Sequence, residues 1–381
     1  MPAPYKLPAP PPASLPAINS NRIQNSLYGF MTSQLLFVAL DLDVFTTIAH
    51  VQTPTVESIY ARLSTQGRYR PHSADMLEAF LDGLVGCGFL YKSAQGVYQL
   101  PADVTRYLVA TLPPQPQQEH EAQNPNFMGG MVAHCRRLYD LWNMLPDVIQ
   151  TGMPAGGAQQ LAEAELRYAE LAQALYASNI APAKKLAHWL KQLLASHNPQ
   201  AKTIADLAGG TGVWSIALLS ALKAQADAKA LADISVDIID YETVLTVTGQ
   251  FAERSGYGEH IKLICGDLET MTLAPNRYDV VFLAHICHVL GEEASQRLLQ
   301  QAANSLTPNG IIAIVDFLSD PARSNATWPM IYNLNLRITT PTGRVIQSEQ
   351  MDAWLNQAGL KAISRFELEP DVWATIAAHN S

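Results

Sequence analysis

The sequence predicts an α/β protein in which a mainly parallel sheet, with helices on both faces, follows a mainly helical N-terminal part. From residue 203 onward, short runs rich in β-branched residues alternate with helical runs, which is the pattern of a parallel sheet. Earlier in the chain, two helical runs precede two short strand-like runs around a glycine, which indicates a winged helix-turn-helix. Of the 381 residues, 48% are hydrophobic and 15% charged, which excludes a disordered chain.

The predicted sheet has seven strands, and the last two form an antiparallel hairpin at its edge. Helices are expected between the strands, among them helices around Val244–Arg254 and Glu293–Ser305. The strands are predicted at Thr203–Leu207, Ile234–Ile239, Ile261–Cys265, Val280–Leu283, Gly310–Phe317, Ala362–Leu368 and Val372–Ala378.

The N-terminal part is expected to begin with one long helix over Gln24–His50, followed by the winged module. The module has predicted helices at Val56–Leu63 and Ser73–Val85, and a wing at Phe89–Lys92 and Val97–Leu100. Further helices are predicted over Met131–Ile149 and Gln159–Leu194. We therefore divide the chain into a disordered proline-rich arm, a winged-helix domain, linking helices and a sheet domain, at residues 1–22, 23–125, 126–200 and 201–381.

Charge and cysteine usage exclude several classes of protein. The net charge is −9, and Thr53–Leu108 has five basic against five acidic residues, so the winged module lacks the basic surface that binds DNA. We therefore expect no nucleic-acid partner and a homodimer formed through the apolar helix faces. The four cysteines lack the spacing of a disulfide framework or a zinc site. No run spans a membrane, and a cytoplasmic location is expected.

Three consecutive strand ends carry residues suited to a nucleoside-type ligand. The first strand runs into a glycine-rich turn, Asp206–Gly212. Three positions after this turn, Ser215 stands where a dinucleotide-binding fingerprint has its third glycine. The second strand ends at Asp240, which can accept hydrogen bonds from ribose hydroxyls, and the third at Gly266–Leu268, where an adenine can lie. A single aspartate after a strand is more often a turn or helix cap. Three in a row predict a ligand site.

Together with Tyr278–His288 and Leu306–Gly310, these motifs resemble S-adenosylmethionine-dependent O-methyltransferases of the plant caffeic acid and animal acetylserotonin type. The resemblance covers nearly everything after about residue 20. It implies a Rossmann-like class I methyltransferase domain, an N-terminal winged-helix dimerisation domain and S-adenosyl-L-methionine as cofactor. It also implies a small aromatic or polyketide-like acceptor from secondary metabolism.

The resemblance also implies roles for individual residues. His288 matches the general base, and Asp316 stands where the family has a glutamate. Asn335 matches an acceptor-contacting position, whereas Met128, Trp328 and Met330 are apolar pocket candidates that ordinary core packing explains equally well. The implied cofactor contacts are Asp206, Ala208, Gly209, Gly210, Gly212, Asp240, Tyr241, Gly266, Asp267, Leu268, His285 and Tyr176.

A histidine base suits methyl transfer to oxygen. A phenol has a pKa of about 10 and is mostly protonated at neutral pH, whereas an imidazole, with an ordinary pKa of about 6.5, can accept its proton. No metal is expected, because His285, Cys287 and His288 lie close together without a distant ligand set.

The sequence departs from the family in three places. Ala208 replaces a glycine, which is a mild change if φ there is negative. Val289 and Val345 stand where the family has acids. The missing acids leave a C- or N-methyltransferase open as an alternative. The winged helix leaves a second alternative, a cofactor-sensing regulator that binds DNA, although the acidic charge balance counts against it.

Overall fold

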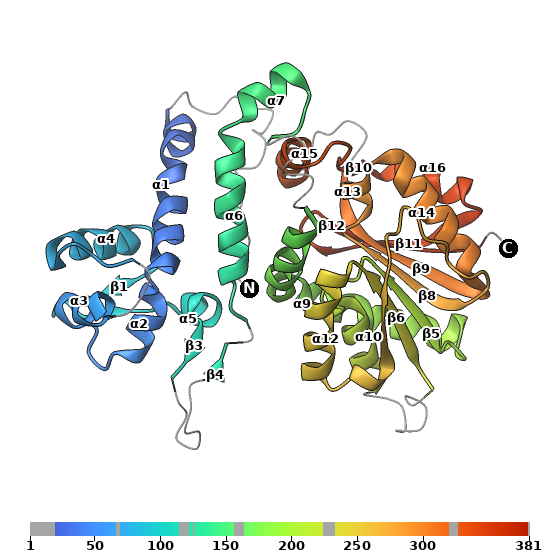
Figure 1. The fold of residues 1–381 in the computed structure, drawn as a ribbon, viewed down its shortest axis with the longest axis horizontal. Coiled ribbons are helices and arrows are strands. Elements are labelled where there is room, and N and C mark those ends of the chain that lie inside the picture. Colours follow the sequence, from blue (N-terminus) through green and yellow to red (C-terminus); the bar gives the residue numbers. More distant parts are fainter. Residues whose placement is uncertain are drawn as a thin grey trace. The chain divides into compact units, whose positions relative to one another are not determined.

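The computed structural model describes residues 20–65, 69–113, 122–124, 126–155, 164–223, 233–319 and 327–379. The chain divides into two compact units, Met1–Leu138 and Tyr139–Ser381, called here the N-terminal and C-terminal units (Figure 1). The predicted arm lies outside the described residues except for Ser20 to Arg22, and Asn21 already belongs to the first helix.

The N-terminal unit begins with two helices, α1 (Asn21–Asp41) and α2 (Val44–His50). The prediction of one continuous helix over Gln24–His50 is wrong, because Asp43 has a φ of 57° and turns the chain between them. Among the described residues, no single helix is long and apolar enough to cross a membrane; α1 and α2 meet that test only when counted together, and they are bent by 56°.

The winged module follows and is held by one apolar core. Its helices are α3 (Val56–Thr65) and α4 (Ala74–Gly86), and its wing pairs β1 (Tyr91–Lys92) with β2 (Tyr98–Gln99). The Ser73 hydroxyl accepts a hydrogen bond from the Met76 amide and caps α4, as its sequence position suggests. The core of the unit includes Phe45, Ile59, Leu63, Leu77, Leu81, Leu84, Leu90 and Tyr98.

Four further helices and one small strand pair follow in the described part of the chain before the sheet. The predicted helix Met131–Ile149 is two helices, because the chain breaks after Trp142. The elements are α5 (Ala102–Leu108), β3 (Thr111–Leu112), β4 (Ala122–Gln123), α6 (Gly129–Trp142), α7 (Leu145–Thr151) and α9 (Ala164–His197).

The seven predicted strands of the C-terminal unit are confirmed, in the order β11-β12-β9-β8-β5-β6-β7. Neighbours from β9 to β7 are parallel, and β12 pairs antiparallel with both β9 and β11. A two-residue strand that was not predicted, β10 (Ile346–Gln347), pairs with β9. The other strands are β5 (Thr203–Leu207), β6 (Ser235–Asp240), β7 (Ile261–Cys265), β8 (Tyr278–Ala284), β9 (Leu306–Ser319), β11 (Leu360–Glu369) and β12 (Val372–His379).

Helices cover both faces of this sheet, and alternate strand residues enter two separate cores (Figure 1). Val280 and Phe282 pack with α9, α10 (Val213–Lys223) and α12 (Glu242–Ser255). Val281 and Leu283 pack with α14 (Glu292–Ser305) and α16 (Ser348–Gln357) on the other face. The remaining helices are η1 (Gly258–His260), α13 (Cys287–Leu290) and α15 (Thr327–Thr339).

One carboxyl group is fully enclosed where β5 ends. Asp206 has no exposed surface, and its Oδ2 accepts a hydrogen bond of 2.7 Å from the Ser215 hydroxyl of α10. Its Oδ1 is buried without a hydrogen-bond partner among the described residues. Burial disfavours the charged form and raises the pKa of Asp206 to about 7.

We predict that Asp206 makes the stability of the protein depend on pH. Its folded-state pKa of about 7 lies above the ordinary 3.8, so between these values the folded protein holds a proton that the unfolded chain has lost. The stability it contributes is full below about pH 4 and is lost as the pH rises toward 7. Asp206→Asn removes this titration and keeps an acceptor for Ser215. In urea unfolding, the free energy of unfolding of the variant relative to wild type should increase by about 2–3 kcal/mol as the pH is raised from 5 to 8.

Asp233→Asn is the control, because the Asp233 side chain is 61% exposed and pairs with Lys202 at the surface. This variant should follow the pH dependence of the wild type. A parallel pH dependence of Asp206→Asn and wild type would contradict the assignment.

Candidate functional site

The register of the parallel strands brings the predicted site residues to one edge of the sheet. Leu207 of β5 pairs with Ile239 of β6 and with Leu283 of β8, while Ala284 of β8 pairs with Val315 of β9. Residues one or two positions beyond these pairs share the carboxyl edge, where ligands of open α/β sheets bind. They are Ala208, Gly209, Asp240, Tyr241, His285 and Asp316, and Gly266 joins them because Asp240 pairs with Cys265 of β7.

The glycine-rich turn after β5 is tightly packed inside and open outside. A Cβ atom at Gly209 would lie 2.7 Å from Ile238 Cγ2, and one at Gly212 would lie 2.7 Å from Ile238 Cδ1, so neither position accepts a side chain. A Cβ atom at Gly210 would meet only Ala172, at 3.6 Å, among the described residues. The backbone at Gly210, beside the start of α10, is therefore the part of the turn that a ligand can approach.

The backbone conformation of Ala208 and the burial of Asp206 distinguish this turn from the one that the sequence predicts. Ala208 has a φ of 54°, so the condition for a mild replacement of glycine is not met, and the alanine costs about 1–2 kcal/mol of backbone strain. Asp206 has no exposed surface, and its contact with the cofactor stays a prediction. Its carboxylate accepts the hydrogen bond from the hydroxyl of Ser215, the residue that replaces the third fingerprint glycine, and this bond joins the end of β5 to α10.

Asp240 joins the turn to the end of β6. Its Oδ2 accepts a hydrogen bond of 2.9 Å from the Gly210 amide, and its Oδ1 accepts one of 2.8 Å from the Tyr241 amide. Burial raises the pKa of Asp240, and these two N–H groups oppose that rise. Each carboxylate oxygen keeps a lone pair that can accept a hydrogen bond from a ligand hydroxyl.

The third strand end has a structural role of its own. Asp267 Oδ1 accepts a hydrogen bond from the Glu269 amide, so this aspartate caps the turn after β7. A Cβ atom at Gly266 would lie 2.8 Å from Met271 Sδ, and Leu268 packs partly buried against the second core. The predicted adenine contacts at these three residues stay predictions.

Helix α9 presents aromatic side chains along one face. Tyr168 stacks on Tyr241 with ring centroids 6.2 Å apart, Ala172 faces Gly210, and Tyr176 lies 4.3 Å from the ring of Phe251. These three α9 residues are four positions apart and therefore share a face. The role of Tyr176 as a cover for the cofactor stays a prediction. Tyr168, which stacks on Tyr241 just after the end of β6, was not among the residues predicted from the sequence.

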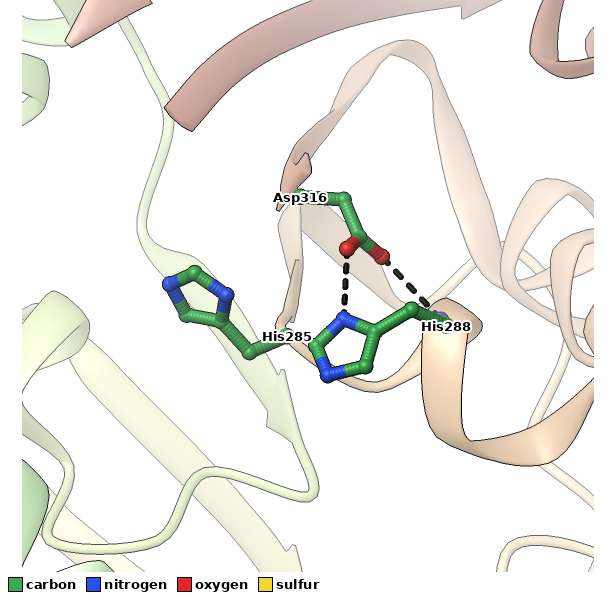
Figure 2. A group of neighbouring side chains, drawn as sticks. All are labelled: His285, His288 and Asp316. Atoms are coloured by element: carbon green, nitrogen blue, oxygen red, sulfur yellow. Dashed lines mark hydrogen bonds and ion pairs between the residues drawn. The ribbon is translucent and has the colours of Figure 1, made fainter. Parts of the chain in front are cut away.

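His288 of α13 and Asp316 of β9 form a buried pair (Figure 2). The imidazole Nδ1 lies 2.5 Å from Asp316 Oδ1, and the His288 amide donates to Asp316 Oδ2 at 3.2 Å. The side chains are only 3% and 1% exposed. Asp316 Oδ1 accepts a second hydrogen bond, of 2.8 Å, from the Phe317 amide. Asp316 therefore fixes Nδ1 as the protonated nitrogen and leaves Nε2 as the acceptor.

His285 lies beside this pair and links it to the glycine-rich turn. Its ring is 5.9 Å from that of His288 and 6.1 Å from that of Trp214, the second residue of α10. Its pKa is lowered to about 4, first because burial disfavours the imidazolium and then because His288 repels it. His285 is therefore a neutral side chain between the two halves of the site.

A cluster of aromatic rings closes the site around Nε2 of His288. Tyr332 of α15 packs edge-on against His288 with centroids 5.5 Å apart, and its ring lies 4.8 Å from that of Phe317. Trp328, one helical turn earlier, lies 5.9 Å from Tyr332 and is 48% exposed. Sequence analysis missed Tyr332, although Trp328, Tyr332 and Asn335 have the spacing of one helix face.

The other predicted acceptor residues lie at different depths. Asn335 is buried, and its Oδ1 accepts a hydrogen bond of 3.0 Å from Trp142 Nε1, which ties the end of α6 to α15. Met330 is half-buried on α15. Met128 belongs to the N-terminal unit, where its amide donates to the Tyr107 carbonyl. Their contacts with an acceptor stay predictions.

Because valines occupy positions 289 and 345, where the family has acids, Asp316 is left without a second carboxylate beside His288 among the described residues. Val345 is buried and apolar, and the neighbouring Arg344 turns its side chain to Glu292. Arg344 touches His288 only through the backbone, with its amide 2.8 Å from the His288 carbonyl. Asp316 is thus the one carboxylate that contacts the His288 imidazole in the part of the chain that the structure describes.

The same residues have the composition of a metal site. Ligand atoms of His285, His288 and Asp316 lie within 4.8 Å of one another. However, two ligands of a tetrahedral zinc ion, each about 2.0–2.1 Å from the metal, lie more than 3 Å apart. The contact of 2.5 Å between His288 and Asp316 instead fits a shared proton. The expectation of no metal stays a prediction.

Comparison with known proteins agrees with this geometry. A family model described as an O-methyltransferase domain matches residues 168–361, and one described as an O-methyltransferase dimerisation domain matches residues 24–111. The chain is similar to the tetracenomycin polyketide synthesis 8-O-methyl transferase TcmO of Streptomyces glaucescens, with 24% identity over 87% of this chain and 88% of that protein.

Solved structures share the fold. Human N-acetylserotonin methyltransferase in complex with S-adenosylmethionine matches with a TM-score of 0.77 and 21% identity, over 97% of this chain and all of that one. An O-methyltransferase from neocarzinostatin biosynthesis, in complex with S-adenosylmethionine and 2-hydroxy-5-methyl naphthoic acid, matches with a TM-score of 0.58 and 17% identity, over 96% and 100%. The resemblance seen in the sequence is confirmed, and the chain belongs to the O-methyltransferase family, with both its methyltransferase domain and its dimerisation domain.

Proposed function

We propose that the protein transfers the methyl group of S-adenosylmethionine to a hydroxyl of a small aromatic or polyketide-like metabolite, with His288 as general base. The observation that carries this proposal is the buried contact of 2.5 Å between His288 Nδ1 and Asp316 Oδ1 at the carboxyl edge of the sheet. It leaves one imidazole nitrogen free to accept a proton in an apolar surrounding.

The residues at this edge fit S-adenosylmethionine. The Gly210 backbone is open to a ligand, and Asp240 keeps lone pairs for two ribose hydroxyls. Tyr168 and Tyr241 supply stacked aromatic surface beside them. When bound, this cofactor supplies a methyl group on a positively charged sulfur.

The chain's own part in the reaction is to orient the acceptor and to take up its proton. His288 Nε2 is the final acceptor of the hydroxyl proton, and Asp316 stabilises the resulting imidazolium. His285 stays neutral beside them, so it adds no competing positive charge. The rings of Phe317, Trp328 and Tyr332 exclude water and offer flat apolar surface to an aromatic acceptor.

Two relatives support the class of acceptor. TcmO is a polyketide synthesis 8-O-methyl transferase, and the O-methyltransferase from neocarzinostatin biosynthesis was crystallised with a naphthoic acid that carries a hydroxyl. A naphthoic acid has two fused aromatic rings, which suits the ring cluster around His288.

We also propose a homodimer formed through the N-terminal unit. The family model for this part is a dimerisation domain, and the first half of α1 exposes a row of large apolar side chains. They are Ile23, Leu27, Tyr28, Phe30 and Met31, each 47–62% exposed. Burying such a surface against a second copy would stabilise the pair.

Removing the Asp240 carboxylate should weaken cofactor binding. Asp240→Ala should lower the affinity for S-adenosylmethionine roughly 10- to 150-fold, or about 1.5–3 kcal/mol, in titration calorimetry. Thr248→Val is the matched control, because it removes the hydroxyl that donates to the Gly210 carbonyl and leaves the carboxylate in place. Its affinity should fall much less. Unchanged affinity in folded Asp240→Ala would contradict the ribose contact.

Removing the base should slow the reaction without weakening cofactor binding. His288→Gln should lower turnover of a polycyclic phenol roughly 10²–10⁴-fold, and Asp316→Asn should also lower it, because the tautomer is no longer fixed. Alkaline pH should partly rescue both variants, since an ionised phenol needs no base. Near wild-type turnover of folded His288→Gln from pH 6 to pH 9 would show that the base is assigned wrongly.

Light scattering at micromolar concentration should give twice the mass of the chain. Leu27→Asp combined with Phe30→Asp should produce monomers, because two charges would be buried in the interface. Tyr91→Asp is the control, since this residue is equally exposed, at 59%, but lies in the wing. A monomeric wild type would exclude the dimer.

A further inference from the structure

The phenol hydroxyl of Tyr332 lies within hydrogen-bonding distance of Nε2, the second imidazole nitrogen of His288. Tyr332 Oη lies 3.5 Å from His288 Nε2, whereas Nδ1 is taken by Asp316. In the described ranges of the chain, Tyr332 Oη has no other hydrogen-bond partner, and neither has Nε2. The imidazole nitrogen of His288 that Asp316 leaves available is therefore next to a hydroxyl of the protein.

The ring of Tyr332 is held in place on several sides. It packs edge-on against His288 at an interplanar angle of 78°, and it contacts Phe317 and Trp328 with centroids 4.8 and 5.9 Å away. Because Trp328 is 48% exposed, this ring cluster reaches from the buried base to the surface of the unit. An aromatic acceptor that enters along Trp328 meets Tyr332 before it meets His288.

Burial and the negative charge of Asp316 keep Tyr332 protonated. Burial raises its pKa, and the negative charge of Asp316 raises it further. His285, the other titratable group facing His288, is neutral, and the buried Cys287 thiol also has a raised pKa. A neutral phenol both donates and accepts, so its hydroxyl can take one proton while it gives up another.

The geometry points to Tyr332 as a proton relay between the acceptor hydroxyl and His288, a role that rests on the methyl transfer proposed above. As the acceptor oxygen bonds to the methyl carbon, the bond from that carbon to the positively charged sulfur breaks and its electron pair stays on the sulfur, which leaves as a neutral thioether. The acceptor's O–H bond breaks at the same time, and its proton passes to Tyr332 Oη. The proton of Tyr332 passes at the same time to His288 Nε2. Tyr332 ends as a neutral phenol, and the positive charge ends on the imidazolium paired with Asp316. The long contact of 3.5 Å shortens when the acceptor is bound, as catalytic hydrogen bonds do.

The relay has a consequence for the choice of acceptor. A hydroxyl that reaches the site protonated needs both Tyr332 and His288, whereas a phenolate has no proton to pass on. Loss of the Tyr332 hydroxyl should therefore slow weakly acidic acceptors and leave strongly acidic ones almost unaffected. A purely structural role of Tyr332 would slow both equally.

The test compares wild type with Tyr332→Phe, which keeps the ring and removes the hydroxyl. With 1-naphthol, Tyr332→Phe should be roughly 10- to 100-fold slower, and with a nitro-substituted naphthol that is ionised at the assay pH it should be within about 3-fold of wild type. Rates in mixtures of H₂O and D₂O should indicate two moving protons in wild type and one in the variant. Tyr257→Phe is the matched control, because Tyr257 is a buried tyrosine 6.2 Å from the ring of His260, outside the site.

A second measurement needs no acceptor. In protein labelled with ¹⁵N-histidine, the Nε2 resonance of His288 should shift when Tyr332 is replaced by Phe, because it loses a hydrogen-bond donor, and should not shift in Tyr257→Phe. An unchanged Nε2 resonance, equal slowing with both naphthols or a single moving proton in wild type would each overturn the relay. Wild type that methylates no hydroxyl would instead contradict the proposed function, and the resonance would then still decide whether Tyr332 contacts the base.

Discussion

The parallel register of β8, β5, β6 and β7, continued by β9, is the constraint on which the rest of the structure depends. It places Ala208, Asp240, Gly266, His285 and Asp316 on one edge, although Ala208 and Asp316 are far apart in the sequence. Because side chains alternate along a strand, a shift of one residue would turn the core faces outward. The two separate cores on either face therefore hold the site in register, and the chemistry at the edge depends on packing far from it.

At this edge of the sheet, the hydrogen bond between His288 and Asp316 determines which imidazole nitrogen can accept a proton. A buried carboxylate is costly unless its lone pairs are used, and Asp316 receives hydrogen bonds from the His288 imidazole and from the amides of His288 and Phe317. The start of α13 beside the end of β9 brings the His288 backbone close enough for this. The side chain can therefore be one methylene shorter than the family's glutamate and still contact the imidazole.

The comparison with the sequence shows which features depend on pattern alone. Alternating apolar runs predict the strands, and glycine and aspartate at strand ends predict where a ligand binds, because these features are local. The break between α1 and α2 was missed, since it depends on the left-handed conformation of Asp43, and Ala208 shows the same limit. Tyr168 and Tyr332 were missed because an aromatic residue on a helix is usually a core residue. Only the tertiary structure brings Tyr168 to Tyr241 and Tyr332 to His288.

This edge of the sheet is proposed to deliver a methyl group to an oxygen atom of the acceptor. The most direct test supplies S-adenosylmethionine labelled with ¹³C in its methyl group, together with a set of aminonaphthols that offer hydroxyl, amino and ring-carbon positions on one molecule. The carbon chemical shift of the product identifies the atom to which the label is attached. We expect a methoxy carbon and no other labelled product. A label on nitrogen or on a ring carbon would contradict this expectation.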